Sequence, residues 1–222
     1  MSKREHIKED DWLLIVDCPF NGNNINLANL SSLTGGTTFT SDPVDSSRQV
    51  AYFTADSHRR YVPLSVFTKD DTGRCKIELD FLFYNHSTPT NPNIIDNSSS
   101  GNGGIYTQKE GVWKLAITNR AWNVTQTPTF AEQRLNIDVS NFTINNWYHL
   151  HIIRIPDLLE VEVTDSNNIQ IGYLRNTQVG VFNASLNGSW MKNLTIGGSS
   201  AYTPRYLNGC IKNLKIYRHK NY

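Results

Sequence analysis

The end of the chain, "WMKNLTIGGSSAYTPRYLNGCIKNLKIYRHKNY" (Trp190–Tyr222), carries the clearest structural signal in the sequence. It contains two short apolar runs, whose members are Leu194 and Ile196 and then Ile211, Leu214, Ile216 and Tyr217. The first run ends at Gly197-Gly198, and the second follows Leu207-Asn208-Gly209. Apolar runs of this length bounded by glycine and asparagine are typical of β-strands. The stretch therefore predicts two strands joined by a glycine-rich turn.

Period-two alternation extends this prediction to the rest of the chain. In "KIELDFLFY" (Lys76–Tyr84), Ile77, Leu79, Phe81 and Phe83 share one face, whereas Glu78 and Asp80 point the other way. "LEVEVTD" (Leu159–Asp165) alternates in the same manner, and no stretch shows a convincing helical repeat. Alternating runs separated by Asn, Gly, Pro and Ser are typical of antiparallel sheets. We therefore expect an all-β protein.

Four segments, in order along the chain, resemble the laminin-G-like, concanavalin A-like jelly rolls. The closing segment is "IGG", a loop, and then aromatic-x-x-Gly-x-Ile-x-x-x-x-Ile-Tyr, which here runs from Tyr206 to Tyr217. The other three are the opening segment (Leu13–Leu64), "INNWYHLHIIR" (Ile144–Arg154) and "LLEVEVTDSNNIQIGYL" (Leu158–Leu174). The resemblance thus covers nearly the whole chain. It implies a two-sheet antiparallel jelly-roll sandwich, a fold that more often holds sugars or protein surfaces than cuts sugars.

The length of 222 residues suits one sandwich domain and is too short for two comfortable ones. We expect this domain to cover residues 12–222, preceded by a charged, flexible arm at residues 1–11. The polar stretch from Asn85 to Gly104 is expected to form a long loop, and loops of that length are often functional.

The balance of charge argues against some classes of partner. The formal net charge is +1 and charged residues make up 18% of the chain, whereas a nucleic-acid-binding domain would show a basic face. His58-Arg59-Arg60 is the nearest approach to a basic patch, and a solvated turn explains it more simply. No apolar run approaches the roughly 18 residues that cross a bilayer, and the first residues show no signal peptide. We therefore expect no nucleic-acid partner and no membrane insertion.

Three cysteines, Cys18, Cys75 and Cys210, cannot all pair within one chain. Cys18 and Cys210 fall in predicted strands near the two ends, so a disulfide between them is conceivable. The simpler interpretation is that all three are small buried side chains. No Cys-x-x-Cys or Cys/His cluster has metal-ligand spacing.

The resemblance raises the question of hydrolysis, because some relatives that cut β-glucans carry Glu-x-Asp-x-x-Glu on one strand. That pattern sets a nucleophile and an acid/base about 5 Å apart for retaining chemistry. This chain has Glu78 and Asp80, but Phe83 occupies the third position. Without a proton donor to the leaving oxygen, the double displacement lacks its acid. We therefore expect no catalytic residues and no enzyme activity.

The resemblance also raises the question of calcium, which many laminin-G-like domains bind through carboxylates near the rim of the sandwich. The positions that match those ligands hold Asn21, Asn26 and Lys212. Ca²⁺ prefers roughly six to eight oxygen ligands with charge from carboxylates, so amides and an ammonium weaken such a site. Candidate ligands of a different site are Asp42, Asp45 and Asp56. We therefore expect no cofactor and no bound metal. Calcium is the one ion that the resemblance keeps open as a possibility.

Sugar binding needs flat aromatic faces for the sugar rings and amides, carboxylates or arginines for the hydroxyls. Three tryptophans lie within predicted strands or at their starts and are expected in the core: Trp12, Trp113 and Trp147. Loop residues supply the candidate ligand-binding set, which is Trp122, Trp190, Tyr202, Tyr206, Arg205, Arg120 and Asn123. His149 and His151 share one strand face, and we interpret them as structural residues.

Together these features predict a non-catalytic, lectin-like recognition module that binds cell-surface glycans. The charged arm, the lack of a signal peptide and the Asn-rich surface favour a phage tail, baseplate or head-fibre component whose arm contacts other virion proteins. The expected location is the virion, or else the extracellular space or cell surface. Two alternatives stay open: a structural or decoration virion protein whose sandwich mediates protein–protein contacts, and a carbohydrate-binding module of a secreted bacterial protein. Fold alone does not choose between them.

Overall fold

The computed structural model describes residues 11–29, 31–62, 75–85, 93–96, 104–110, 114–120, 133–155, 158–176, 194–199 and 205–220. Within 104–110, 114–120 and 133–134 and at 176, it describes the backbone only. The predicted arm, apart from Asp11, lies outside the described residues, and so does Trp113.

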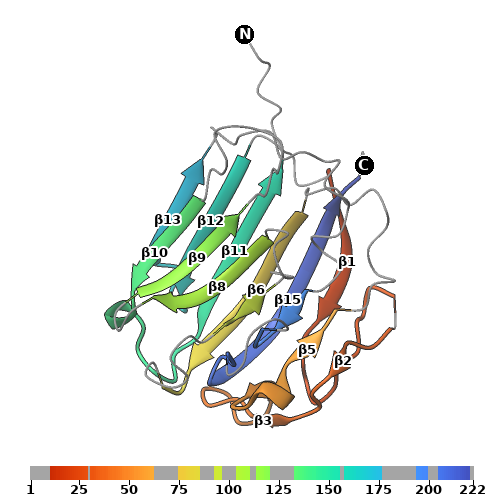
Figure 1. The fold of residues 1–222 in the computed structure, drawn as a ribbon. Coiled ribbons are helices and arrows are strands. Elements are labelled where there is room, and N and C mark those ends of the chain that lie inside the picture. Colours follow the sequence, from red (N-terminus) through yellow and green to blue (C-terminus); the bar gives the residue numbers. More distant parts are fainter. Residues whose placement is uncertain are drawn as a thin grey trace.

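Two antiparallel sheets lie face to face (Figure 1). The large sheet has the order β13-β12-β11-β6-β15-β4-β3, and β1 also pairs with β15. Its strands are β1 (Trp12–Cys18), β3 (Phe39–Ser41), β4 (Gln49–Phe53), β6 (Cys75–Phe83), β11 (Tyr148–Ile155), β12 (Leu158–Asp165), β13 (Gln170–Asn176) and β15 (Gly209–His219). The long strand β15 runs beside β6 through the middle of this sheet, close to β1 (Figure 1).

The small sheet has the order β10-β9-β8-β7-β14-β5-β2. Its strands are β2 (Thr34–Gly35), β5 (Arg60–Tyr61), β7 (Ile95–Asp96), β8 (Gly104–Glu110), β9 (Lys114–Arg120), β10 (Gln133–Asp138) and β14 (Thr195–Ile196). Two 3₁₀ turns, η2 (Asp56–His58) and η4 (Val139–Asn141), are also described. The predicted all-β, two-sheet antiparallel jelly-roll sandwich is confirmed.

The alternation in β6 decides which face of the large sheet meets the small one. Ile77, Leu79 and Phe81 are fully buried between the sheets, and each such side chain contributes about 1.5–3 kcal/mol on burial. Glu78 and Asp80 therefore point to the opposite side, which we call the outer face. A shift of one residue would exchange the two sets, so this pattern fixes the register.

The two predicted C-terminal strands form, but they belong to different sheets. β14 pairs with β5 and β7 in the small sheet, whereas β15 lies in the large one. Gly197, directly after β14, has φ +74°, and a Cβ at this position would collide with the ring of Phe53. The glycine predicted to form a turn therefore lets the chain leave one sheet and pass close to the other.

The polar stretch from Asn85 to Gly104 was expected to be a loop, and this expectation is wrong in its middle. β7 lies there and joins β14 to β8, and Ile94 and Ile95 are fully buried. Two apolar residues are too few to show a period in sequence, so the strand was missed.

The structure also answers the cysteine question, because all three cysteines are buried and none forms a disulfide. Cys18 packs in the core between the sheets, whereas Cys210 belongs to an apolar cluster on the outer face, together with Val50, Leu82 and Trp147. The two cysteines therefore lie on opposite faces of the large sheet and do not pair. Burial raises the pKa of each of these two thiols to about 12.

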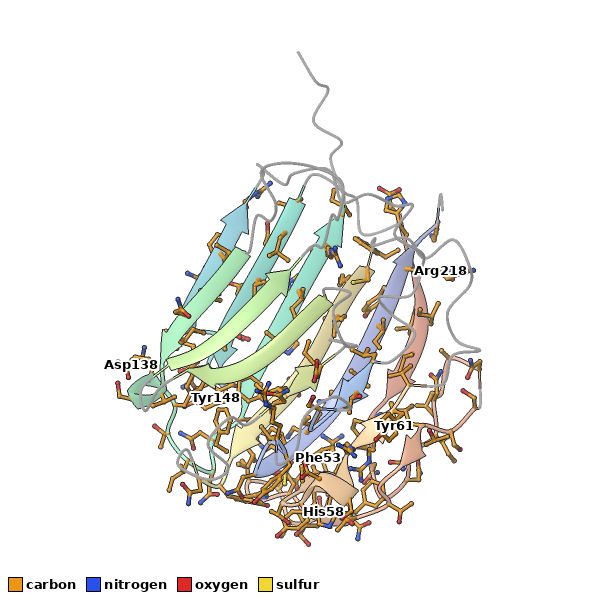
Figure 2. The ribbon with its side chains drawn as sticks, viewed as in Figure 1. Phe53, His58, Tyr61, Asp138, Tyr148 and Arg218 are labelled. Carbon is orange, nitrogen blue, oxygen red and sulfur yellow. The ribbon has the colours of Figure 1, made fainter. Side chains whose placement is uncertain are left out.

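The solvated turn expected at His58-Arg59-Arg60 is wrong for Arg60, which is fully buried. Its guanidinium lies over three aromatic rings, with centroid distances of 4.6, 4.9 and 5.4 Å to Phe53, Phe39 and Phe20. It donates hydrogen bonds of 2.7, 3.0 and 2.6 Å to Asn24 Oδ1, the His58 carbonyl and the Thr38 carbonyl. Figure 2 shows Phe53 and His58 at the same end of the sandwich, far from Arg218. We call this group the Arg60 cluster.

Candidate functional site

An open cavity of about 380 Å³ lies on the outer face of the large sheet. The residues that line it are Arg48, Glu78, Asp80, His149, Asn213 and Lys215. They come from the neighbouring strands β11, β6 and β15 and from the hairpin between β3 and β4. We call it the outer cavity, and it is the candidate functional site of this chain.

The strand register brings the polar side chains into rows across the sheet. His149 is the direct partner of Asp80, and His151 is the direct partner of Glu78. On the other side of β6, Lys215 is also paired with Glu78. Side chains that lie directly opposite one another in an antiparallel pair are close enough to interact. The row of polar positions along β6 thus meets polar positions on both of its neighbours.

A β-bulge in β15 adds one more polar side chain to the cavity. Lys212 pairs with Asp80 and Lys215 with Glu78, so two residues of β15 lie opposite Leu79 alone. Asn213 takes the left-handed conformation, with φ 54°, which asparagine tolerates better than most residues. Its side-chain amide donates a 2.6 Å hydrogen bond to Asp80. Bulges often occur beside functional sites, where they redirect a side chain in this way.

Arg48 is positioned by the loop between β3 and β4. Asp42 N donates to the Arg48 carbonyl, and Arg48 N donates to the Asp45 carbonyl. The Asp45 side chain accepts bonds from both the N–H and the hydroxyl of Ser47, which closes the turn just before Arg48. A second cavity of about 100 Å³ shares Arg48 and Asn213 with the outer cavity and is otherwise lined by Pro19, Asn21, Gln49, Val50 and Lys212.

The two carboxylates of the cavity have partners within the protein. Glu78 lies 3.0 Å from Lys76 Nζ and accepts a 3.1 Å bond from the Tyr217 hydroxyl. Burial opposes ionisation of Glu78, but the hydrogen bond and charge of Lys76 outweigh it and lower the pKa of this carboxyl. Asp80 accepts from His149 Nδ1 at 2.8 Å as well as from Asn213. The carboxylates are therefore held in place before any ligand arrives.

The two histidines behave differently although they are two residues apart. The hydrogen bond to Asp80 raises the pKa of His149 against the opposing effect of burial. Burial lowers the pKa of His151, whose Nε2 is 3.9 Å from Glu78 and makes no hydrogen bond to any described residue. We interpreted both as structural from sequence, but His149 lines the outer cavity and is 43% exposed at its side chain.

The residue that replaces the third glucanase carboxylate is directed away from this site. Phe83 is 2% exposed and packs in the core between the sheets, while Glu78 and Asp80 stand on the outer face. Position 83 therefore presents no side chain to the cavity.

Asn26 stands at one of the positions matched to calcium ligands. Its side chain forms hydrogen bonds with the backbone of β1. Its side-chain oxygen accepts from Asp17 N at 2.8 Å and its amide donates to the Ile15 carbonyl at 3.0 Å. The side chain thus makes the two bonds that a neighbouring strand would make. Asn26 is fully buried, so these bonds satisfy groups that water cannot reach.

Lys212, at another of those positions, holds an ammonium against Asp42. Its Nζ lies 2.8 Å from Asp42 Oδ2 and 4.0 Å from the centroid of the Trp147 ring. Trp147 Nε1 donates to the same carboxylate at 2.9 Å. Burial opposes ionisation of Asp42, but these hydrogen bonds lower its pKa. Of the other aspartates suggested for calcium, Asp45 accepts from Ser47 and Asp56 from Arg205 N.

Within the described ranges, no group of three or more His, Cys, Asp or Glu side chains is arranged to hold a metal ion. In the same part of the chain, no helix is long and apolar enough to cross a membrane.

Most of the sugar-binding set predicted from sequence lies outside the described residues, namely Trp122, Asn123, Trp190 and Tyr202. Arg120 ends β9, where only the backbone is described. Arg205 and Tyr206 are half-buried, and Arg205 N bonds to Asp56 of η2. None of this set lines the outer cavity among the residues described. Trp12 and Trp147 are both 7% exposed, as expected, and they belong to two apolar clusters on the outer face.

No protein-family model and no curated protein sequence matches this chain. Similar solved structures include domain 4 of AbnA, a GH43 extracellular arabinanase from Geobacillus stearothermophilus, in complex with arabinotriose. The TM-score is 0.57, the identity is 12%, and 94% of each chain is covered. Tailspike protein 2 of bacteriophage CBA120, in its enzymatically active domain, gives a TM-score of 0.50 at 11% identity over 98% of this chain and 30% of the tailspike. At such identities the likeness concerns the β-sandwich fold alone.

Proposed function

We propose that this protein is a non-catalytic glycan-binding module and that the outer cavity holds the sugar. The observation that carries the proposal is an open cavity whose polar side chains are already held in position by each other. Small-ligand sites are concave and mostly preformed, with a few convergent polar groups that fix the orientation of the ligand. The outer cavity has these properties.

The residues of the cavity suit the hydroxyl groups of a sugar, which both donate and accept hydrogen bonds. Asp80 and Glu78 offer carboxylate oxygens as acceptors, while Arg48 and Lys215 offer donors. Because Asp80 is held by His149 and Asn213, little side-chain freedom is lost when a ligand binds. Tyr217, bonded to Glu78, places an aromatic side chain beside this group.

The absence of catalysis is part of the proposal. Retaining glycosidases need a second carboxyl group about 5 Å from the first, one of them poised to give a proton to the leaving oxygen. Here Glu78 is committed to Lys76 and Tyr217, and Asp80 to His149 and Asn213. Lowering the pKa of Glu78, as Lys76 does, disfavours the protonated acid that such a step requires.

We also propose that the module acts outside a cell, as a component of a phage particle that recognises a surface glycan. The tailspike similarity and the arabinanase domain with its arabinotriose support a sugar-directed role for this fold. The charged residues 1–11 would then contact another virion protein. A carbohydrate-binding module of a secreted bacterial protein is the alternative setting for the same activity.

A glycan array on the purified protein, followed by calorimetry with the best glycan, tests the proposal. Arg48→Ala and Asp80→Asn should each weaken binding about tenfold or more, as expected when a polar side chain that anchors a ligand is removed. Arg175→Ala is the matched control, because Arg175 pairs with Glu160 on the same sheet and does not line the cavity.

Trp122→Ala and Trp190→Ala should be measured in the same series. If these variants lose binding and the cavity variants do not, the sugar site is in the loops and the outer cavity is the wrong location. If no glycan binds at all, the protein is better explained as a structural or decoration protein whose sandwich contacts other virion proteins.

A further inference from the structure

We propose that the glycan bound in the outer cavity is acidic, with its anionic group held between Arg48 and Lys215. This inference rests on the proposed function, since it names the chemical class of the ligand at that same site. It follows from which charges of the cavity already have partners and which do not.

The two acidic side chains of the cavity already have partners within the protein. Glu78 has Lys76 at 3.0 Å, and both side chains are mostly buried, with 21% and 7% of their surfaces exposed. Asp80 has His149 at 2.8 Å and the amide of Asn213 at 2.6 Å. Lys76 therefore balances the charge of Glu78, and His149 balances that of Asp80 when the imidazole is protonated.

The two long basic side chains of the cavity are not neutralised in this way. Among the described residues, neither Arg48 nor Lys215 is within ion-pair distance of a carboxylate, although Asp17 and Glu78 are the cross-strand neighbours of Lys215. Asp45, three residues before Arg48, accepts from Ser47, and the charge of Arg48 acts on it only from beyond ion-pair distance, as a smaller cause of its lowered pKa.

Three other basic side chains of the same sheet do have such partners. Lys212 pairs with Asp42 at 2.8 Å, Lys76 with Glu78 at 3.0 Å and Arg175 with Glu160 at 3.4 Å. Arg48 and Lys215 thus lie in one cavity without a carboxylate partner among the described residues, and a charged hydrogen bond to an anionic ligand group would supply what each lacks. Arg60 also lacks a carboxylate among them, but its guanidinium is fully buried and donates to three protein acceptors.

His149 adds to this positive character under mildly acidic conditions. The groups that face it are Asp80 and Glu78 on β6 and Glu162 on β12, and all three favour its charged form. Asn213 and Lys215 of β15 complete the wall of the cavity. Binding of an anionic glycan should therefore strengthen as the pH falls from about 8 toward about 6, the range in which histidine gains its proton.

The test uses glycans in matched pairs that differ only in charge. An array carries uronic-acid oligosaccharides with their methyl esters, and sulfated oligosaccharides with their desulfated forms. We expect the bound glycans to be acidic, with the free acid or sulfate binding at least about tenfold more tightly than its capped partner at low salt. The two kinds of pair distinguish a carboxylate from a sulfate as the recognised group.

Two conservative variants locate the anionic group. Arg48→Gln and Lys215→Gln should lower the affinity for the acidic glycan toward that of its capped partner, while the affinity for the capped form stays unchanged. The control, Arg175→Gln, should leave both affinities as in the wild type. Because all three side chains are at the surface, melting temperatures should confirm that each variant folds.

Four outcomes would overturn the inference. Equal binding of the charged and capped forms, or a uniform loss of affinity for both in Lys215→Gln, means that charge is not recognised, although the proposed function then stands. An array on which only neutral glycans bind has the same meaning. An array on which nothing binds removes the proposed function, and this inference with it.

Discussion

The Arg60 cluster and the outer cavity both gather basic and polar side chains, yet they differ in how completely those groups are paired. All the nitrogens of the Arg60 guanidinium donate to protein acceptors, and three aromatic rings surround it. The outer cavity holds Arg48 and Lys215 without a described carboxylate partner, and it is open. Complete pairing makes a polar cluster part of the structure, and incomplete pairing leaves it able to bind.

The same contrast appears in the electrostatics. Burial lowers the pKa of Arg60 to about 10, so the guanidinium stays charged near neutral pH even without a carboxylate partner. Carbonyl oxygens and the faces of aromatic rings stabilise the charge instead. A buried charge is tolerated only when it is surrounded by such groups. The side chains of the outer cavity are open to solvent, so their charges need no such enclosure.

Loss of Arg60 should produce the largest effect on stability. Arg60→Ala leaves three partly buried acceptors without this donor and removes the packing against Phe53 and Phe39, so we expect a loss of about 3–5 kcal/mol in the free energy of unfolding. Urea denaturation measures it. Arg48→Ala serves as the comparison and should cost less than about 0.5 kcal/mol, as surface substitutions usually do. Similar losses in the two variants would erase the distinction between the two sites.

Asn26 is a smaller example of complete pairing and should show an intermediate effect. Asn26→Ala removes the bonds to Asp17 N and the Ile15 carbonyl, so we expect a loss of about 1–3 kcal/mol by the same measurement. Asn23→Ala is a suitable control, because Asn23 is exposed and its side chain accepts only from the nearby Ile25 N. If calcium rather than hydrogen bonding gave Asn26 its importance, adding calcium would change the wild type's stability and leave Asn26→Ala unaffected.

The histidines on the outer face should give a weaker, pH-dependent effect. Folding raises the pKa of His149. The stability that this histidine contributes is therefore full below its pKa in the unfolded chain, near 6.5, and is lost as the pH rises through its pKa in the folded protein. His149→Gln should therefore be less stable than the wild type at about pH 5.5 and nearly equal to it at about pH 8, with a difference below about 1 kcal/mol because the pair is partly exposed.

His151 provides the opposite case. Burial lowers the pKa of His151. The stability that it contributes is therefore present above its pKa in the unfolded chain and is lost as the pH falls through its pKa in the folded protein. His151→Gln should gain stability relative to the wild type at acidic pH. For each variant, the stability difference from the wild type is measured as a function of pH. If the two differences change in the same direction with pH, the opposite pKa shifts assigned to His149 and His151 are wrong.

Removal of divalent ions should have the smallest effect. Asn26 and Lys212 occupy positions where the resemblance placed carboxylates, and Asp42 is bonded to Lys212. EDTA should therefore barely change the melting temperature. By contrast, an ion present at about a thousand times its Kd would stabilise the fold by roughly 4 kcal/mol, and its removal would lower the free energy of unfolding by that amount. If calcium shifts the melting temperature by many degrees, the expectation that this protein has no calcium site is wrong.

Much of the fold could be predicted from the sequence because strands such as β6 and β12 alternate over many residues, and alternation is a property of the chain itself. β7 was missed because Ile94 and Ile95 stand alone in polar surroundings. Arg60 was misjudged because its charge suggests solvent, and only the folded structure brings distant aromatic rings around it.

The outer cavity was out of reach for a different reason. Glu78 and Asp80 were noticed, but their partners lie on β11 and β15, and only the register between strands brings them together. The one local signal was the polar "KN" step in "IKNLKI", where the regular alternation of β15 breaks at Asn213. Such a break is compatible with a bulge, a turn or the end of a strand, so it does not identify a site by itself.

The bulge at Asn213 also has a genetic consequence. Leu214 packs in the core, and both Lys212 and Lys215 face outward. Deletion of the single Asn213 codon would leave Lys212, Leu214 and Lys215 in the regular out–in–out order of a strand, so the core would keep its pattern. The amide that lines the outer cavity and donates to Asp80 would be gone. In a lineage of such genes, the insertion or deletion of one codon would therefore add or remove the contact between Asn213 and Asp80 in the cavity, without passing through an unfolded protein.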